Sequence, residues 1–171
     1  MKIKSILLCC VILAVGAVST FGQAKTSLDY LKAGSVLYIN HQYKEAIVPY
    51  SKALDLEKKD RKLERTWWIV LVDNLSIAYG ITGDLKNSRE VIEYGISQDA
   101  TYPLFYYNMA CSYGEENVEE NAIKYLRLAY KNKDNMLESE SLPDPATDSS
   151  FQNLMKSASF RKALAEMKSG K

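Results

Sequence analysis

The sequence predicts an all-α protein made of consecutive helical hairpins, and three observations lead to this expectation. Apolar residues recur at helical spacing from about residue 27 to the C-terminus. The strict alternation of apolar and polar residues that is typical of strands is hardly seen. Three stretches of the chain also share one order of large and small residues, which indicates an internal repeat.

The N-terminal segment differs from the rest of the chain. Lysines at its start precede an unbroken apolar stretch from Ile6 to Val18, and small or polar residues follow. This order is typical of a secretory signal peptide, which we expect to span residues 1–22 and to be cleaved near Gly22 to Ala24. The apolar stretch is shorter than the ~20 residues of a membrane-spanning helix. We therefore expect export to the periplasm or the extracellular space, with a membrane anchor only if the segment is retained.

The predicted helices follow one another in three stretches that superpose. Each stretch has the order large, apolar, small and large in a first helix, then small, large and small in a second. The offset from Val72 to Tyr106 is 34 residues and that from Tyr30 to Val72 is 42, so eight residues are inserted between the first two stretches. The matching residues are Tyr30, Ala33, Gly34, Leu37, Ala46, Tyr50 and Ala53; then Val72, Leu75, Ser76, Tyr79, Ser88, Ile92 and Gly95; then Tyr106, Met109, Ala110, Tyr113, Ala122, Leu126 and Ala129.

This pattern resembles the tetratricopeptide repeat, whose 34-residue helix–turn–helix unit has W-x2-L-G-x2-Y, A-x3-F and A at these places. The resemblance covers about residues 27–132. It implies a right-handed superhelical solenoid of three helical hairpins, at about residues 27–60, 69–102 and 103–134. The hairpins are expected to stack, because no single hairpin can bury its apolar face alone.

Local signals place the close contacts and the turns of these hairpins. Small residues are expected where two helices approach each other, as at Gly34, Ala46 and Ala53. Glycine or asparagine can take the left-handed conformation that ends a helix. On this basis turns are predicted at Asn40-His41, at Gly83-Asp84 and at Gly114.

Two features depart from the repeat pattern. Pro49 falls inside the second helix of the first hairpin, where a proline removes a hydrogen bond, and it predicts a bend rather than a break. The inserted segment Glu57–Arg65 is charged and favours a helix. We interpret it as a solvated helical overhang, with a docking arm as the alternative.

The composition changes after the third hairpin. Residues 135–147 contain prolines, serines and acids and are predicted to form a loop. Apolar residues then return at helical spacing, so residues 148–171 are predicted to form two capping helices that begin at Asp148 and Ser157. Their expected role is to cover the last hairpin, since the terminal units of a solenoid need a cap.

Few residues indicate catalysis. His41 is the only histidine and falls in a predicted turn, with no serine, cysteine or acid placed beside it by any motif. Cys111, the only cysteine after the predicted signal peptide, is interpreted as a small buried hydrophobe rather than a redox or acylation site. The chain has no glycine-rich phosphate loop and no G-x-S-x-G or H-E-x-x-H motif. We therefore expect no enzyme activity, no cofactor and no metal.

The charge balance argues against a nucleic-acid partner. The chain has 22 Lys and Arg residues and 21 Asp and Glu residues. Loss of residues 1–22 would remove two lysines and no acid, which leaves 20 basic residues against 21 acidic ones. Nucleic-acid binders usually carry a basic excess, so we expect a protein partner and no nucleic acid.

The resemblance also implies a binding site, because the first helices of such repeats line a concave face that contacts ligands. That face is mainly apolar here, with two tyrosines and few charges. Chaperone-binding members clamp an acidic C-terminus with basic and amide side chains, and only Asn74 agrees with that set. The groove residues implied by the resemblance are Leu31, Ser35, Tyr38, Val70, Asp73, Asn74, Ile77, Tyr107 and Cys111.

These observations predict a protein-binding adaptor that holds a peptide or a helix in an apolar groove. The alternative is a self-associating structural module, in which the groove is filled by the chain's own C-terminal helices or by a second copy in a homo-oligomer. The adjacent Trp67 and Trp68 and the crowded tyrosines fit either expectation, as core residues between hairpins or as aromatic anchors for a bound segment.

Overall fold

The computed structural model describes residues 25–138 and 140–170, so the predicted signal peptide lies outside the described residues. In this part of the chain all regular structure is helical, which confirms the predicted all-α class. Short 3-10 turns precede the last α-helix. The helices are α1 (Ser27–Ile39), α2 (Tyr43–Lys59), α3 (Arg65–Ile81), α4 (Leu85–Gln98), α5 (Pro103–Glu115), α6 (Glu119–Lys131), η1 (Lys133–Asn135), η2 (Ser149–Phe151), η3 (Leu154–Lys156) and α7 (Ala158–Ser169).

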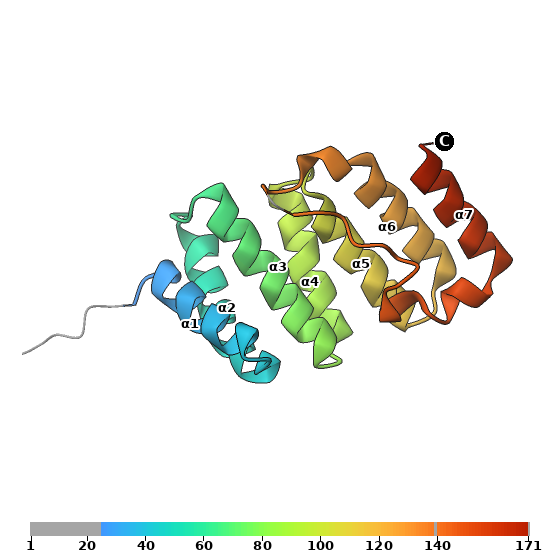
Figure 1. The fold of residues 1–171 in the computed structure, drawn as a ribbon. Coiled ribbons are helices and arrows are strands. Elements are labelled where there is room, and N and C mark those ends of the chain that lie inside the picture. Colours follow the sequence, from blue (N-terminus) through green and yellow to red (C-terminus); the bar gives the residue numbers. More distant parts are fainter. Residues whose placement is uncertain (1–24, 139, 171) are drawn as a thin grey trace, which may run out of the picture.

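Neighbouring helices pack against each other in chain order, as a helical repeat requires. Figure 1 shows them as a row that begins with α1 and ends with α7. The first helices of successive hairpins also contact one another, α1 with α3 and α3 with α5. These three helices therefore share one side of the row, which is where the sequence predicts the groove.

The three hairpins turn in the same way. His41, Gly83 and Asn117 adopt positive φ angles of 59°, 83° and 59°, and they are spaced 42 and 34 residues apart like the sequence stretches. In each turn the next residue donates its N–H to a carbonyl five residues back, as Gln42 does to Leu37 at 2.9 Å. The turns predicted at His41 and Gly83 are confirmed. The one at Gly114 was wrong, because Gly114 lies inside α5 and Asn117 takes the left-handed position.

Small residues allow the helices to approach, as predicted. A Cβ atom added to Gly34 would collide with the ring of Tyr50, which is fully buried. A Cβ on Gly95 would lie 2.9 Å from Val72 Cγ1 and 3.0 Å from the Phe105 ring. These contacts join the two helices of the first hairpin and connect α4 with the helices on either side of it.

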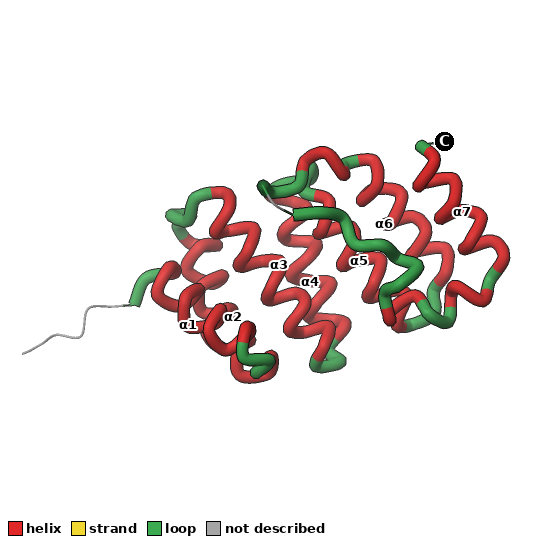
Figure 2. The backbone as a smooth tube through the Cα atoms, viewed as in Figure 1, coloured by secondary structure: helices red, strands yellow, loops and turns green. Residues whose placement is uncertain are grey.

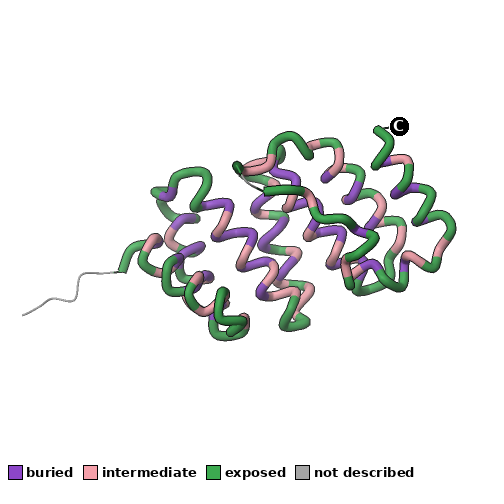
Figure 3. Tube along the Cα trace, in the orientation of Figure 1, coloured by how far each residue is buried: buried purple, intermediate pink, exposed green. Residues whose placement is uncertain are grey.

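The buried side chains form two clusters that meet at α5. The first extends from α1 to α5 and includes Trp68, whose ring is 5.9 Å from that of Phe105. The second joins α5, α6, α7 and the turn η2. Figure 3 shows the buried residues concentrated between the helices. Because both clusters draw on α5, the row has a continuous interior.

The charged segment after α2 is only partly helical. α2 ends at Lys59 and α3 begins at Arg65, so the predicted overhang is wrong for the five residues between them. Glu57 is only 2% exposed, and its Oε2 accepts hydrogen bonds from the backbone N–H groups of Lys62 and Leu63 at 3.1 and 3.0 Å. This carboxylate stabilises the loop, because it accepts hydrogen bonds from two backbone N–H groups. In a continued helix these groups would instead donate to carbonyls of the preceding turn. α2 itself continues through Pro49 without a break.

The C-terminal segment caps the last hairpin with less α-helix than expected. Asp148 and Ser157 act as N-caps, accepting hydrogen bonds from Ser150 N at 2.9 Å and Phe160 N at 3.4 Å. However, the first of the two predicted helices is a pair of 3-10 turns, η2 and η3. A 3-10 turn aligns residues three apart. This geometry buries both Phe151 and Leu154 within a short segment, and α7 then packs on α6.

We expect Gly34→Ala to lower the free energy of unfolding by about 1–3 kcal/mol, because the new methyl group has no space beside the Tyr50 ring. Urea denaturation monitored by circular dichroism measures the change. Gly80→Ala is the matched control in α3, where the added Cβ would meet only Ser88 Oγ at 3.7 Å. That variant should be unchanged or up to about 1 kcal/mol more stable. Equal effects at the two sites would contradict the packing described for α1 and α2.

Candidate binding groove

The α1 end of the groove is organised by a buried tyrosine from α2. Tyr50 Oη donates to Ser35 Oγ at 3.3 Å and accepts from Asn74 Nδ2 at 3.2 Å. Ser35 Oγ also donates to the carbonyl of Leu31 at 2.9 Å. Two predicted groove residues, Ser35 and Asn74, are thus connected through the Tyr50 hydroxyl. Leu31 joins them only through its carbonyl and is buried in the core. This network fixes α1 relative to α3.

Apolar side chains are exposed at the C-terminal ends of α1 and α3. Ile39 is 74% exposed and Ile81 is 56% exposed, and the two are 42 residues apart, so they occupy the same place in successive hairpins. Tyr38 lies beside them, half-buried, with its ring 5.1 Å from that of Tyr43. Burial raises the pKa of its hydroxyl. This end of the face presents apolar surface to solvent.

A carboxyl group lies buried in the middle of α3. Asp73 is 9% exposed, and its Oδ1 accepts a hydrogen bond from Asn108 Nδ2 at 2.7 Å. Burial raises the pKa of Asp73 to about 7, and the charge of Glu140 adds to this shift, while the hydrogen bond from Asn108 opposes it. The equivalent residues of the other hairpins, 42 before and 34 after, are Leu31 and Tyr107. This position of the repeat therefore holds an acid in the second hairpin and a large uncharged residue in the other two.

The chain covers the α5 end of the groove with its own residues 136–138 and 140–148, here called the strap. Figures 1 and 2 show it crossing the face of the row in front of α5. Tyr102 Oη, at the start of α5, donates to Glu140 Oε2 at 2.8 Å. Tyr107 Oη, in the middle of α5, donates to Asp148 Oδ2 at 2.9 Å. The strap therefore runs alongside α5 in the same direction.

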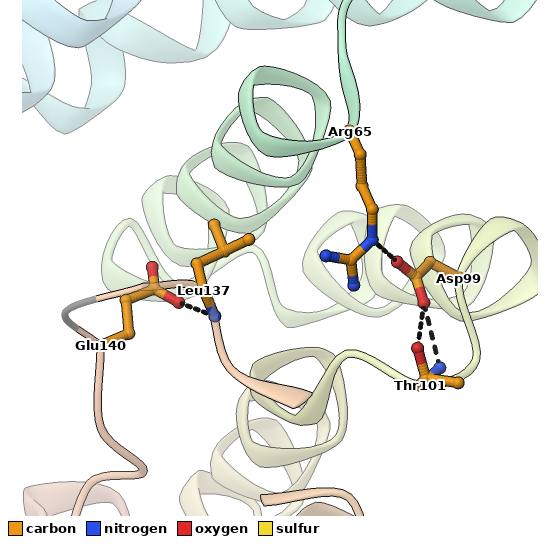
Figure 4. A network of polar contacts seen from close by, with 5 residues as sticks. All are labelled: Arg65, Asp99, Thr101, Leu137 and Glu140. Carbon is orange, nitrogen blue, oxygen red and sulfur yellow. Dashed lines mark hydrogen bonds and ion pairs between the residues drawn. The ribbon is translucent and has the colours of Figure 1, made fainter. Parts of the chain in front are cut away.

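Further contacts lie within the strap and next to each of its ends. Glu140 Oε2 also accepts the backbone N–H of Leu137 at 3.3 Å, as Figure 4 shows. The same figure shows Arg65, at the start of α3, bonded to Asp99 at 2.8 Å in the turn before α5. Beyond the strap, Gly114 leaves space for the carbonyl of Ser150 and the ring of Phe151. A larger residue at Gly114 would keep η2 away from α5.

A cavity of about 650 Å³ lies between α3, α4, α5 and the end of the strap. Asp73, Ile77, Tyr107 and Cys111 line it, which brings together four of the predicted groove residues. Val70 lies apart from them and packs against the N-terminal core cluster. The volume falls within the range that is typical of ligand sites.

Tyr107 and Cys111 lie on the side of the cavity that the strap approaches, Tyr107 buried and Cys111 partly buried. Tyr107 is 2% exposed beneath the strap, with its ring 5.9 Å from that of Phe151. Cys111 Sγ lies 3.8 Å from Asp148 Oδ2. Burial, with a further contribution from Asp148, raises the pKa of the Cys111 thiol well above its usual value. A thiol held in its protonated form is a poor nucleophile.

The sequence reasoning missed Asn108 and the strap as parts of the site. Asn108 stands 34 residues after Asn74, so the repeat itself could have identified it. Both amides donate across the groove face to an element of the preceding hairpin, Asn74 to Tyr50 and Asn108 to Asp73. The strap has no periodicity that would predict where it lies.

Other candidate chemistry is sparse in the described residues. His41 lies exposed in its turn, 2.9 Å from Tyr43 Oη, and away from the cavity. Within residues 25–138 and 140–170, no group of His, Cys, Asp and Glu side chains is arranged to hold a metal ion. No helix in those ranges has the length and apolar character needed to cross a membrane. No protein-family model matches the sequence, and no curated protein matches it.

We expect the ionisation of Asp73 to destabilise the fold. The pKa of this carboxyl is about 7 in the folded chain against 3.8 without the shift, so between these values the folded state holds a proton that the unfolded state has lost. Raising the pH through this window therefore lowers the free energy of unfolding, by at most about 1.4 kcal/mol per pH unit. Above pH 7 both states are ionised and this contribution is constant.

Asp73→Asn removes this contribution, because the amide keeps an acceptor for Asn108 and carries no charge. Urea denaturation of both proteins at several values between pH 4 and pH 8 measures the difference. The variant should gain stability over the wild type as the pH rises. A difference that is independent of pH would show that Asp73 ionises freely in the folded state.

We also expect the two tyrosine hydroxyls to hold the strap closed. Tyr102→Phe combined with Tyr107→Phe removes both hydrogen bonds, each of which stabilises by about 1 kcal/mol, so local opening should increase by about tenfold to thirtyfold. The readout is the alkylation rate of Cys111, quantified on its own peptide by mass spectrometry. The control is Tyr113→Phe with Tyr125→Phe, a stacked pair away from the strap. Equal rates in both double variants would rule out anchoring by the hydroxyls.

Proposed function

We propose that this chain is an exported adaptor of the tetratricopeptide-repeat type, which binds a segment of another protein along the α1 and α3 part of the groove. The proposal does not involve catalysis. The partner would lie on the apolar end of the face and reach toward the cavity in front of the strap. A peptide or an amphipathic helix suits such a surface.

The observation that carries the proposal is the pair of exposed isoleucines on the groove side. Ile39 and Ile81 occupy the same place in successive hairpins, at 74% and 56% exposure, so they form a repeated contact pattern rather than an isolated apolar residue. The hairpins that present them share one turn geometry at the spacing of the repeat. Exposed apolar residues repeated on one face are typical of a binding surface.

A second candidate function is favoured by the strap. Because the strap and η2 already cover α5, part of the groove is filled by the chain itself. In a self-associating module, the remaining isoleucines would contact a second copy. The two candidates differ in whether a heterologous protein occupies the exposed end.

A crosslinking pull-down from envelope and secreted fractions tests the proposal, with the full chain as bait. The groove variant is Ile39→Ser with Ile81→Ser. Its matched control is Val48→Ser with Val118→Ser, which removes exposed apolar side chains from α2 and from the turn before α6. We expect one protein to be captured by the wild type and the control and lost with the groove variant.

Two other outcomes would count against the adaptor. If the groove variant captures the same protein as the wild type, the partner does not bind at this face. If only the bait is recovered and light scattering gives a dimer that the groove variant abolishes, the self-associating module replaces the adaptor.

A further inference from the structure

The cavity contains a buried carboxyl group whose hydrogen-bonding capacity is only partly used. Asp73 is 9% exposed, and its Oδ1 accepts the single hydrogen bond from Asn108. Its other oxygen, Oδ2, forms no hydrogen bond with the described residues, and it is not among their fully buried polar atoms, so it remains accessible. A buried carboxylate is normally paired or fully hydrogen-bonded, since its desolvation is otherwise costly. Asp73 therefore has an unused acceptor in a cavity with room for a ligand.

The surroundings of Asp73 provide no positive charge to pair with it. Of the described residues that line the cavity, none is lysine, arginine or histidine, and Glu115 and Asp148 add two further carboxyl groups. Asp148 is already engaged, because Tyr107 Oη and Ser150 N donate to its two oxygens. Glu115 is exposed at the end of α5. The vacant acceptor is thus specific to Asp73.

Arg89 contacts one residue of the cavity lining, but its guanidinium is already bonded elsewhere. Arg89 donates from Nη1 to Ser112 Oγ at 2.9 Å, and Ser112 lines the cavity. Its Nη2 donates to Glu116 at 3.0 Å, outside the lining residues. The ring of Tyr113 lies 5.1 Å from the guanidinium. Arg89 is therefore paired with Glu116 and forms no ion pair with Asp73.

The walls of the cavity suit the aliphatic part of a long basic side chain. Ile77, Leu85, Leu104 and Pro143 contribute apolar surface around the acid. Lysine and arginine bury their methylene stems along such surfaces while the charged head finds a polar partner. A planar guanidinium also presents several N–H donors. One of them can reach Oδ2 of Asp73 while Oδ1 keeps its hydrogen bond from Asn108.

We propose that this cavity takes an arginine or lysine side chain of the bound polypeptide, with its cationic head paired to Asp73. This inference rests on the proposed function, because it identifies the chemistry that the groove recognises. The groups around Asp73 are consistent with it: Tyr38 from α1, Tyr102 from α5 and Glu140 from the strap all interact with its charge, and none is cationic. The place of Asp73 in the repeat adds support, because Leu31 and Tyr107 at the equivalent positions have no charge.

The test uses the full chain and two matched tripeptides, acetyl-Gly-Arg-Gly-amide and its citrulline counterpart, in which a neutral urea replaces the guanidinium. Binding is followed by NMR through the methyl groups of Ile77 and Ile81, which line the cavity. The variants are Asp73→Asn and, as a control with the same change in charge, Asp134→Asn in the exposed turn η1. A third titration uses n-butylguanidinium, which corresponds to the arginine side chain with its Cα carbon and lacks the peptide groups.

In the wild type and in Asp134→Asn we expect the arginine peptide to bind at least tenfold more tightly than the citrulline peptide. In Asp73→Asn the two peptides should bind within twofold of each other. Equal binding of both peptides by the wild type, a preference that survives in Asp73→Asn, or no saturable shift with either peptide would overturn the proposal. Binding of n-butylguanidinium without binding of the arginine peptide would also overturn it, in favour of a site for small free cations.

The two experiments distinguish a failure of this inference from a failure of the proposed function. The adaptor fails if no heterologous protein is lost with the isoleucine variant, whatever the tripeptides do. The basic side-chain site fails if Asp73 does not discriminate charge, even when a partner protein is captured.

Discussion

The fold depends on one helix that is buried on three sides. Phe105, Tyr106 and Tyr107 follow one another in α5, and successive residues of a helix point about 100° apart. Phe105 packs into the N-terminal cluster, Tyr106 into the C-terminal cluster, and Tyr107 beneath the segment that crosses the groove. Three consecutive aromatic residues therefore fix α5 relative to the helices before it, the helices after it and the strap. The two halves of the row share a single interior because of this helix.

The groove face combines one well-satisfied polar network with one incomplete one. At the α1 end, the hydroxyl of Tyr50 satisfies both Ser35 and Asn74, and it tightens the contact between two hairpins. In the middle of the face, Asp73 receives one hydrogen bond and no countercharge. The buried carboxyl of Asp73 has an uncharged counterpart in each neighbouring hairpin, so the packing of the repeat does not itself require an acid at this position. Both networks include a residue of α3, Asn74 in the first and Asp73 in the second, but only the first satisfies its polar groups with several hydrogen bonds.

The regular parts of the fold could be predicted from the sequence because they follow local rules. Helical spacing identified the helices, and small residues such as Gly34 identified the close contacts. The segment after α2 could not be predicted from composition. Glu57 appears as one more charged residue in a charged run, and only its burial makes it an acceptor for two backbone N–H groups. The position of a long-range hydrogen bond is not encoded by periodicity.

The candidate site was less predictable for the same reason. Position within the repeat placed Asp73, Ile77, Tyr107 and Cys111 on one face, and the structure brings these four residues together around the cavity. It gave no indication that the strap returns over α5, because this segment has neither helical spacing nor a repeat counterpart. Its location depends on two tyrosine hydroxyls that meet acids about 40 residues later in the chain. The burial of each groove residue could therefore be determined only from the structure, and not from its position in the repeat.

The two segments that cover the third hairpin also affect where further helical hairpins could be added to the row. α7 covers α6, and the strap covers the groove side of α5, so both helices of that hairpin are packed against segments that follow them in the chain. The connection between α2 and α3 is packed as well, because Arg61 Cζ lies 4.2 Å from the centroid of the Trp68 ring. In the same connection Glu57 accepts hydrogen bonds from the backbone of Lys62 and Leu63. A further hairpin stacked on the third would therefore have to displace α7 or the strap, and one inserted after α2 would have to preserve the contacts of Glu57.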